Sequence, residues 1–166
     1  MNKRLLSMCV MAMMGVLLTA GKEVMAFLPN FEPVTLLIVL FTLSFGPVAM
    51  GAVCVFLLLE GLLDGFGSWW VMYLYIWPLL AALTWVFRRM DKAWQWAVFA
   101  GLYGLCFGTL CSLTYLPVGG VRMMFAWIIS GLPFDFMHAG GNFLLMLLLY
   151  RPLKGALDRL RGVSGL

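Results

Sequence analysis

Charged residues are scarce in this chain, and their scarcity excludes most classes of soluble protein. Asp, Glu, Lys and Arg make up 11% of the 166 residues, whereas hydrophobic residues make up 64%. Soluble domains carry about a quarter charged residues. Long apolar runs with so few charges are typical of an integral membrane protein. The longest polar interruption, Arg88 to Lys92, is too short for a separate soluble catalytic domain.

Metal ligands and nucleotide-binding motifs are also lacking. The chain has one histidine and no Cys-x-x-Cys pair among its cysteines, so no metal and no other cofactor is expected. The cysteines are expected to be small packing residues: Cys9, Cys54, Cys106 and Cys111. Because no P-loop and no Gly-x-Ser-x-Gly sequence is present, we expect neither ATP hydrolysis nor serine hydrolase chemistry. The net charge of +4 comes from basic residues at the ends of apolar runs, and no nucleic-acid partner is expected.

Apolar runs of about 20 residues predict an all-α integral membrane protein. We expect one domain over residues 1–166, a bundle of six transmembrane helices with both termini in the cytoplasm. The expected spans are roughly 5–28, 33–45, 47–63, 69–87, 94–115 and 133–150. Residues 120–131 are expected to form an outer cap or re-entrant piece, and Pro133 to begin the last span, since the first turn of a helix tolerates proline. The basic and apolar N-terminal segment is typical of a signal peptide too, but the apolar character resumes at Val24 and favours a first span.

Residues 33–63 leave two alternatives open, one long tilted span or two short spans that turn at Gly46-Pro47. Six spans with an inner N-terminus place nine basic residues inside and two, Lys22 and Arg122, outside. Five spans with an outer N-terminus give eight inside and three outside. Because basic residues favour the cytoplasmic side, this distribution favours six spans.

Polar residues in the last apolar segment give the strongest indication of a functional site. Asp135, His138 and Asn142 are spaced by three and four positions, so they lie on one face of a helix. Polar groups at membrane depth need partners, and such residues therefore mark either a binding site or a helix–helix contact. Asp135 is expected in the first turn of the last span, with His138 one turn deeper.

Other unusual residues gather near the expected outer face. Trp69, Trp70 and Tyr73 form either an interfacial belt or a stacking wall for a planar ligand. Glu60 and Asp64 form either a solvated helix end or, with His138, the site of a small intramembrane enzyme. Close helix packing is expected at a row of small residues: Gly101, Gly104 and Gly108.

Two segments form a recognisable pattern: Pro29 to Thr35 after the first span, and Gly131 to Asp135 with His138 and Gly141-Asn142 in the last. This pattern resembles the substrate-specific membrane subunits (S components) of energy-coupling factor (ECF) vitamin transporters. The resemblance covers nearly the whole chain, including its length and six spans. Within the family, the pattern is most similar to the cobalamin-type S components.

The resemblance implies a nonenzymatic, multi-pass protein of a prokaryotic plasma membrane, in contact with lipid. It would bind a vitamin or vitamin precursor in its outer half and dock on a transmembrane coupling subunit with two ATPase subunits. Family members often dock through Ala-x-x-x-Ala on the first helix. Here Ala12 is followed by Val16, and the nearest small pair is Gly15 and Thr19, so the docking surface stays open.

The acidic, aromatic outer face fits a neutral or cationic planar ligand, for example a cobalamin-related compound, riboflavin or a modified nucleobase. The predicted substrate-binding residues are Asn30, Glu32, Trp69, Trp70, Tyr73, Trp127, Phe134, Asp135, His138 and Asn142. Two other functions remain open at this point, the small intramembrane enzyme and a channel or sensor subunit whose polar face holds an oligomer together.

Overall fold

Residues 2–27 and 31–164 are described by the computed structural model, and they form helices without any β-strand. In chain order the elements are α1 (Lys3–Val24), α2 (Val34–Phe45), α3 (Val48–Asp64), α4 (Ser68–Val86), α5 (Ala93–Leu105), α6 (Phe107–Ser112), the 3-10 turn η1 (Leu113–Tyr115) and α7 (Leu116–Ser164). The expectation of an all-helical protein is therefore confirmed for the described residues.

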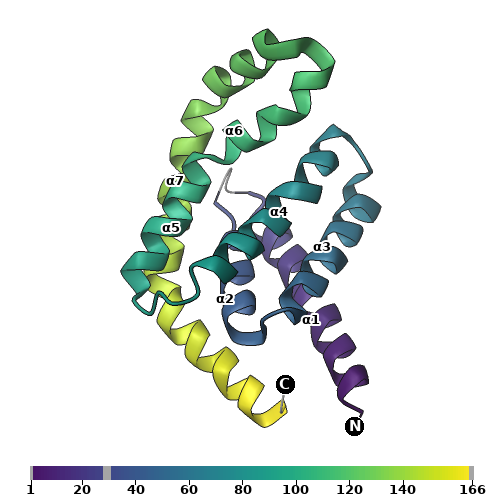
Figure 1. Cartoon of the computed structure of the whole chain (residues 1–166), viewed down its shortest axis with the longest axis vertical. Coiled ribbons are helices and arrows are strands. Elements are labelled where there is room, and N and C mark those ends of the chain that lie inside the picture. The colour runs from purple at the N-terminus through teal and green to yellow at the C-terminus, as the bar shows by residue number, and fades with distance from the viewer. Residues whose placement is uncertain (1, 28–30, 165–166) are drawn as a thin grey trace.

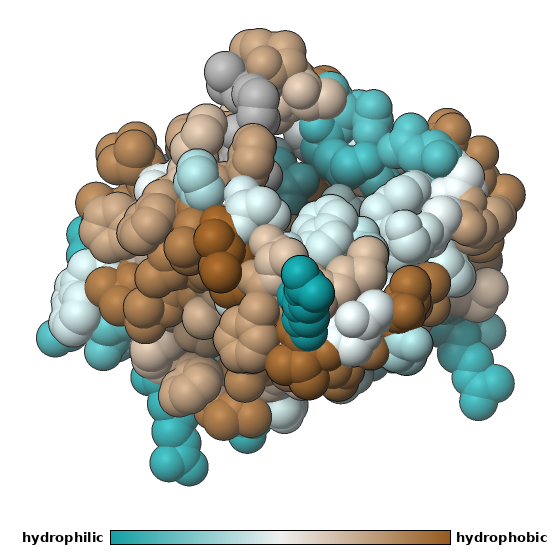
Figure 2. Space-filling model, turned by 90° about the horizontal axis from the view of Figure 1, so that it is seen from above, coloured by the Kyte–Doolittle hydropathy of each residue, from teal (hydrophilic) through white to brown (hydrophobic). Residues whose placement is uncertain are grey.

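Within the described residues, three helical segments are long and apolar enough to cross a membrane: Lys3–Val24, Ser68–Val86 and the run Ala93–Val163, which spans α5, α6 and nearly all of α7. Large apolar side chains also cover much of the surface, including Leu62 and Leu148, which are 65% and 69% exposed. Figure 2 shows brown apolar residues over most of one face, with hydrophilic residues in separate groups. Such a surface suits lipid better than water, and indicates a membrane protein.

The helices pack as neighbours in a bundle (Figure 1). α5 lies along α7 and α1 lies along α3, while α2 contacts α3, α4 and α7. Most of α2 is buried for this reason, from Val34 to Phe41 with the exception of Leu37. The start of α1 and the end of α7 lie at the same end of the molecule, and the turn between α3 and α4 lies toward the opposite end.

Residues 33–63 form two helices, so the alternative of one continuous helix is excluded. α2 ends at Phe45, and Gly46 adopts a φ of 57°, a left-handed conformation that glycine accepts without steric cost. Pro47 follows and precedes the first residue of α3, where a missing N–H donor is tolerated.

The last third of the chain differs from the expected boundaries. α5 ends at Leu105, and the short α6 follows, so the helix expected over 94–115 is interrupted at Cys106. The break lies between Gly104 and Gly108, and glycine is among the weakest helix formers.

The expected helix start at Pro133 is also wrong. α7 kinks at Gly120, where φ is 66°, and then stays helical through Pro133 and Pro152 to Ser164. Residues 121–131 are therefore part of this helix, and Asp135 lies well inside it. Proline interrupts one backbone hydrogen bond, and membrane helices often tolerate this because neighbouring groups satisfy the freed carbonyl.

The end of α7 folds under the bundle and binds the C-terminal end of α2. Ser44 Oγ donates a hydrogen bond of 3.0 Å to Asp158 Oδ1, and Arg161 Nη1 donates one of 3.1 Å to the Ser44 carbonyl. Lys154 Nζ contacts Asp158 at 2.6 Å. Arg161 thus satisfies one of the carbonyls that the end of α2 leaves without a helical partner.

Candidate functional site

The polar face of α7 points into the protein. Asp135, His138 and Asn142 are only 4%, 3% and 3% exposed, which confirms that they share an inward face. Asp135 Oδ1 accepts a hydrogen bond of 2.8 Å from the Gly108 N–H, and Asn142 Nδ2 donates one of 3.2 Å to Thr35 Oγ1. This face therefore binds two other helices, α6 and α2, through buried hydrogen bonds.

Glycine permits the close approach of α5 to this face. A Cβ added at Gly104 would lie 2.9 Å from the backbone nitrogen of Ala139 and from the backbone carbonyl of His138. One added at Gly108 would lie 2.5 Å from Asp135 Oδ2. The predicted close packing of the small-residue row is thus confirmed, although Gly108 belongs to α6.

Glu32 reaches the same region from the segment between α1 and α2. Its Oε1 lies 3.8 Å from His138 Nε2, and the Glu32 side chain is 17% exposed. That separation is too long for a hydrogen bond. Burial raises the pKa of Glu32 to about 7; the ammonium of Lys22 opposes this rise, and the carboxylate of Glu60 adds to it. Glu32 therefore gains or loses a proton near neutral pH.

A row of aromatic rings extends from α4 to His138. Ring centroids are 5.3 Å apart for Trp69 and Tyr73, 5.4 Å for Tyr73 and Trp77, and 5.5 Å for Trp77 and Phe107. Phe107 then contacts the His138 ring at 4.6 Å. The structure thus brings two predicted aromatic residues, Trp69 and Tyr73, into one row with His138.

Sequence reasoning missed Trp77 and Phe107 as site residues. The spacing of 69, 73 and 77 by four positions places these residues on one face of α4, and this periodicity was the available signal for Trp77. Phe107 had no comparable local signal, because it reaches the row only through the break between α5 and α6.

Other predicted residues do not join this row. Trp70 Nε1 donates a hydrogen bond of 2.7 Å to the Leu57 carbonyl, so this indole fastens α4 to α3. Trp127 is 42% exposed and stacks on Tyr115 at 4.3 Å, and Phe134 is 55% exposed. Asn30 lies outside the described residues.

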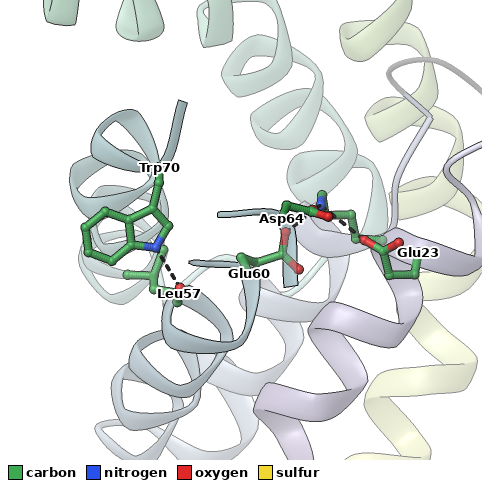
Figure 3. Close-up of polar contacts among 6 residues, drawn as sticks. Glu23, Leu57, Glu60, Asp64 and Trp70 are labelled. Atoms are coloured by element: carbon green, nitrogen blue, oxygen red, sulfur yellow. Dashed lines mark hydrogen bonds and ion pairs between the residues drawn. The ribbon is translucent and has the colours of Figure 1, made fainter. Parts of the chain in front are cut away.

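An acidic cluster surrounds Lys22 near the row. Lys22 Nζ lies 2.5 Å from Glu60 Oε2, 2.9 Å from Asp64 Oδ2 and 3.2 Å from Glu23 Oε1. Figure 3 shows the side chains of Glu23, Glu60 and Asp64 gathered there, beside the hydrogen bond from Trp70 to Leu57. Lys22 also lies 5.9 Å from the centre of the Trp69 ring, which joins the cluster to the row.

This cluster changes the interpretation of Glu60. Its side chain is fully buried, so Glu60 is not part of a solvated helix end, whereas the Asp64 side chain is 47% exposed. One oxygen from each acid lies within 4.8 Å of the others, a spacing that suits a metal ion, but the ammonium of Lys22 contacts all three groups. Glu60 and Asp64 thus pair with Lys22, while the carboxylate beside His138 is that of Glu32.

Two cavities lie away from these residues. One of about 270 Å³ is lined by residues at the turn between α2 and α3, including Gly46 and Pro47. Another cavity, of about 440 Å³, lies beside residues 150–158 of α7, and Arg88 and Lys154 are among its lining residues. None of the predicted site residues that the structure describes lines either cavity, so the candidate site is defined by its side-chain contacts.

Comparisons of the chain with protein-family models, with curated proteins and with solved structures find no match.

Proposed function

We propose that this chain is the substrate-binding membrane subunit, or S component, of an ECF-type transporter for a vitamin or vitamin precursor, with a cobalamin-related compound as the first candidate. One observation carries the proposal. The two segments that resemble the family are about a hundred positions apart in the chain, and the described residues 31–35 of the first lie against the inward face of the second. Glu32 lies 3.8 Å from His138, and Thr35 accepts a hydrogen bond from Asn142 at 3.2 Å.

The chemistry of this region supports ligand binding. Binding sites for small molecules combine apolar and aromatic walls with a few polar groups that fix orientation. Here Trp69 and Tyr73 supply the wall, and Glu32, Asp135 and His138 supply the polar groups. The pair formed by Thr35 and Asn142 would support the site from below rather than contact the ligand.

We further propose that the chain crosses the membrane six times, with both termini in the cytoplasm. Its proposed location is the plasma membrane of a prokaryotic cell. The distribution of basic residues supports this orientation. The start of α1 and the end of α7 share one end of the bundle (Figure 1) and carry basic residues, among them Lys3, Arg4, Arg159 and Arg161.

The proposed partners are a transmembrane coupling subunit and two ATPase subunits, which would supply the energy for transport. The chain carries no nucleotide-binding motif, so in the proposed transporter these partners would bind and hydrolyse ATP. Gly15 and Thr19 are buried, with Gly15 packed against Val55, so this small pair faces α3. The exposed side of α1 instead carries a row of small and medium residues at four-residue spacing, which we propose as the docking surface: Ala12, Val16 and Ala20.

Mass spectrometry of small molecules that copurify with the detergent-solubilised protein tests this function. A stoichiometric vitamin or precursor is expected, and Asp135→Ala or His138→Ala should weaken its binding while the protein stays folded. Phe136→Ala is the matched control, because Phe136 neighbours Asp135 but is 65% exposed and is not among the predicted binding residues. A protein that stays ligand-free after incubation with a vitamin panel would contradict the proposal.

A further inference from the structure

Three buried polar atoms near the end of the aromatic row have no hydrogen-bond partner among the described residues. They are Trp77 Nε1, Asp135 Oδ2 and His138 Nε2. Their side chains belong to residues that are 0%, 4% and 3% exposed. Leaving such a group without a partner costs about 1–3 kcal/mol. Three such groups in one region therefore reduce the stability of the ligand-free protein, and helix packing alone gives no reason to bury them.

Two other tryptophans show how indoles in this protein are normally satisfied. Trp96 is also fully buried, and its Nε1 donates a hydrogen bond of 3.1 Å to the Met90 carbonyl. Trp70 Nε1 donates one of 2.7 Å to the Leu57 carbonyl. The N–H of Trp77 differs from these, because it is buried within the bundle and has no acceptor in the part of the chain that the structure describes.

Phe107 connects the three unpartnered groups. Its ring centroid lies 5.5 Å from that of Trp77 and 4.6 Å from that of His138. Asp135 binds the backbone N–H of the next residue, Gly108, through its other oxygen. The groups therefore approach one aromatic ring from α4 and α7, and this ring stands at the start of α6.

The chemistry of the three groups defines what would satisfy them. An indole N–H is only a donor, so it requires an acceptor, whereas an ionised carboxylate oxygen requires a donor. A neutral histidine nitrogen accepts or donates according to its tautomer. An aromatic ring beside them favours a flat partner that stacks. A planar ring that carries nitrogen or oxygen acceptors and an N–H or amino donor would accept from the indole, donate to the carboxylate and stack on the aromatic ring.

We propose that Trp77, Asp135 and His138 hydrogen-bond the ring of a nitrogen heteroaromatic ligand that stacks against Phe107. This inference rests on the proposed function and narrows its substrate class. It adds Trp77 and Phe107 to the binding residues, and it excludes ligands that bind through an anionic group. Lys22 is already paired with Glu23, Glu60 and Asp64, and Asp135 offers an anion no positive charge.

The test measures ligand binding to the purified full chain by calorimetry with five probes. Riboflavin, thiamine and 5,6-dimethylbenzimidazole carry nitrogen heteroaromatic rings, whereas biotin and pantothenate are carboxylates without such a ring. At least one of the first three probes is expected to bind. Binding of biotin or pantothenate alone would overturn the inference and leave the transport function standing. Binding of no probe would overturn the inference, and it would overturn the transport function as well if no vitamin copurifies with the chain.

Two variants then test the residues against a matched control. Trp77→Phe removes the unpartnered N–H together with part of the ring, so affinity should fall at least about tenfold, the effect of losing roughly one hydrogen bond. Asp135→Asn retains an acceptor for the Gly108 N–H but replaces the free carboxylate oxygen, and should weaken binding by a similar factor. Trp96→Phe should lower thermal stability and leave affinity unchanged, since its N–H bond to Met90 lies outside the site.

The outcomes separate a binding role from a folding role. Trp77→Phe and Trp96→Phe each shrink a fully buried ring, so both should lower the melting temperature, but only Trp77→Phe should also lower affinity. Unchanged affinity in both Trp77→Phe and Asp135→Asn, for a probe that binds the wild-type chain, would overturn the inference.

Discussion

The amide of Asn142 donates a hydrogen bond of 3.2 Å to the hydroxyl of Thr35, across 107 positions of the chain. Both side chains are buried, with exposed fractions of 3% and 0%. A double-mutant cycle of Thr35→Val and Asn142→Leu should give a coupling energy of about 0.6 kcal/mol, the average for polar contacts between membrane helices. Thermal or denaturant unfolding in detergent measures it. Strictly additive effects would show that the two residues do not stabilise the fold together.

Gly104→Ala should destabilise the protein by about 1–3 kcal/mol, because the new methyl group meets backbone atoms of α7 that cannot move aside. The added Cβ would lie 2.9 Å from the Ala139 nitrogen and the His138 carbonyl. Gly140→Ala is the control, since no atom lies within 4 Å of its added Cβ. That change should stabilise the helix slightly, because alanine is the better helix former. Equal melting temperatures for the two variants would contradict the close packing.

Lys22→Met should destabilise the protein strongly, by about 3–5 kcal/mol, since it leaves the buried carboxylate of Glu60 without its counter-ion. The Glu60 side chain is fully buried and pairs with Lys22 at 2.5 Å. Adding Glu60→Met to this variant should restore much of the stability. Glu23→Gln is the control, because the Glu23 side chain is 48% exposed and exposed pairs contribute less than about 1 kcal/mol. Thermal unfolding of the four proteins distinguishes these effects.

Glu32 should make stability depend on pH near neutrality. Burial raises its pKa from 4.5 to about 7, so the folded protein favours the protonated carboxyl group. This contribution is complete below about pH 4.5 and is lost as the pH rises through about 7, with a maximum of roughly 3 kcal/mol. The wild-type protein should therefore melt at a lower temperature at pH 8 than at pH 5.

Glu32→Gln isolates this effect, because it keeps the size of the side chain and removes its titration. The difference in melting temperature between variant and wild type should grow from pH 5 to pH 8, in favour of the variant. A constant difference over this range would show that Glu32 does not titrate there.

The proposed orientation is tested by labelling single cysteines in intact cells with a membrane-impermeant maleimide, after Cys9, Cys54, Cys106 and Cys111 are replaced by alanine. Ser68→Cys, at the start of α4, should react from outside, and Asp91→Cys, between α4 and α5, should react only after the cells are opened. The opposite pattern would invert the topology.

Local spacing predicted the inward polar face of α7 because three- and four-residue intervals map directly onto one side of a helix. Asp135, His138 and Asn142 all obey this rule. Their partners could not be predicted in the same way. Gly108 and Thr35 come from distant segments, and nothing in a local window indicates which segments become neighbours.

Hydropathy was a weaker guide to the aromatic residues and helix ends. Lipid is as apolar as a protein core, so an aromatic residue gives no sign of which of the two it faces. Trp77 is fully buried, whereas Trp127 is 42% exposed, although both lie in apolar segments. Pro133 likewise fits both a helix start and a helix interior, and only the packing of the rest of α7 decides between them.

α2 and α7 are fastened to each other at two separated points. Thr35 and Asn142 join them beside the candidate site, and Ser44 joins Asp158 and Arg161 at the other end of α2. Two helices that are joined at both ends resist sliding past each other and move as one rigid body. A ligand that displaces His138 would therefore tilt α2 and α7 together, and the distant contact of Ser44 with Asp158 and Arg161 would move with them.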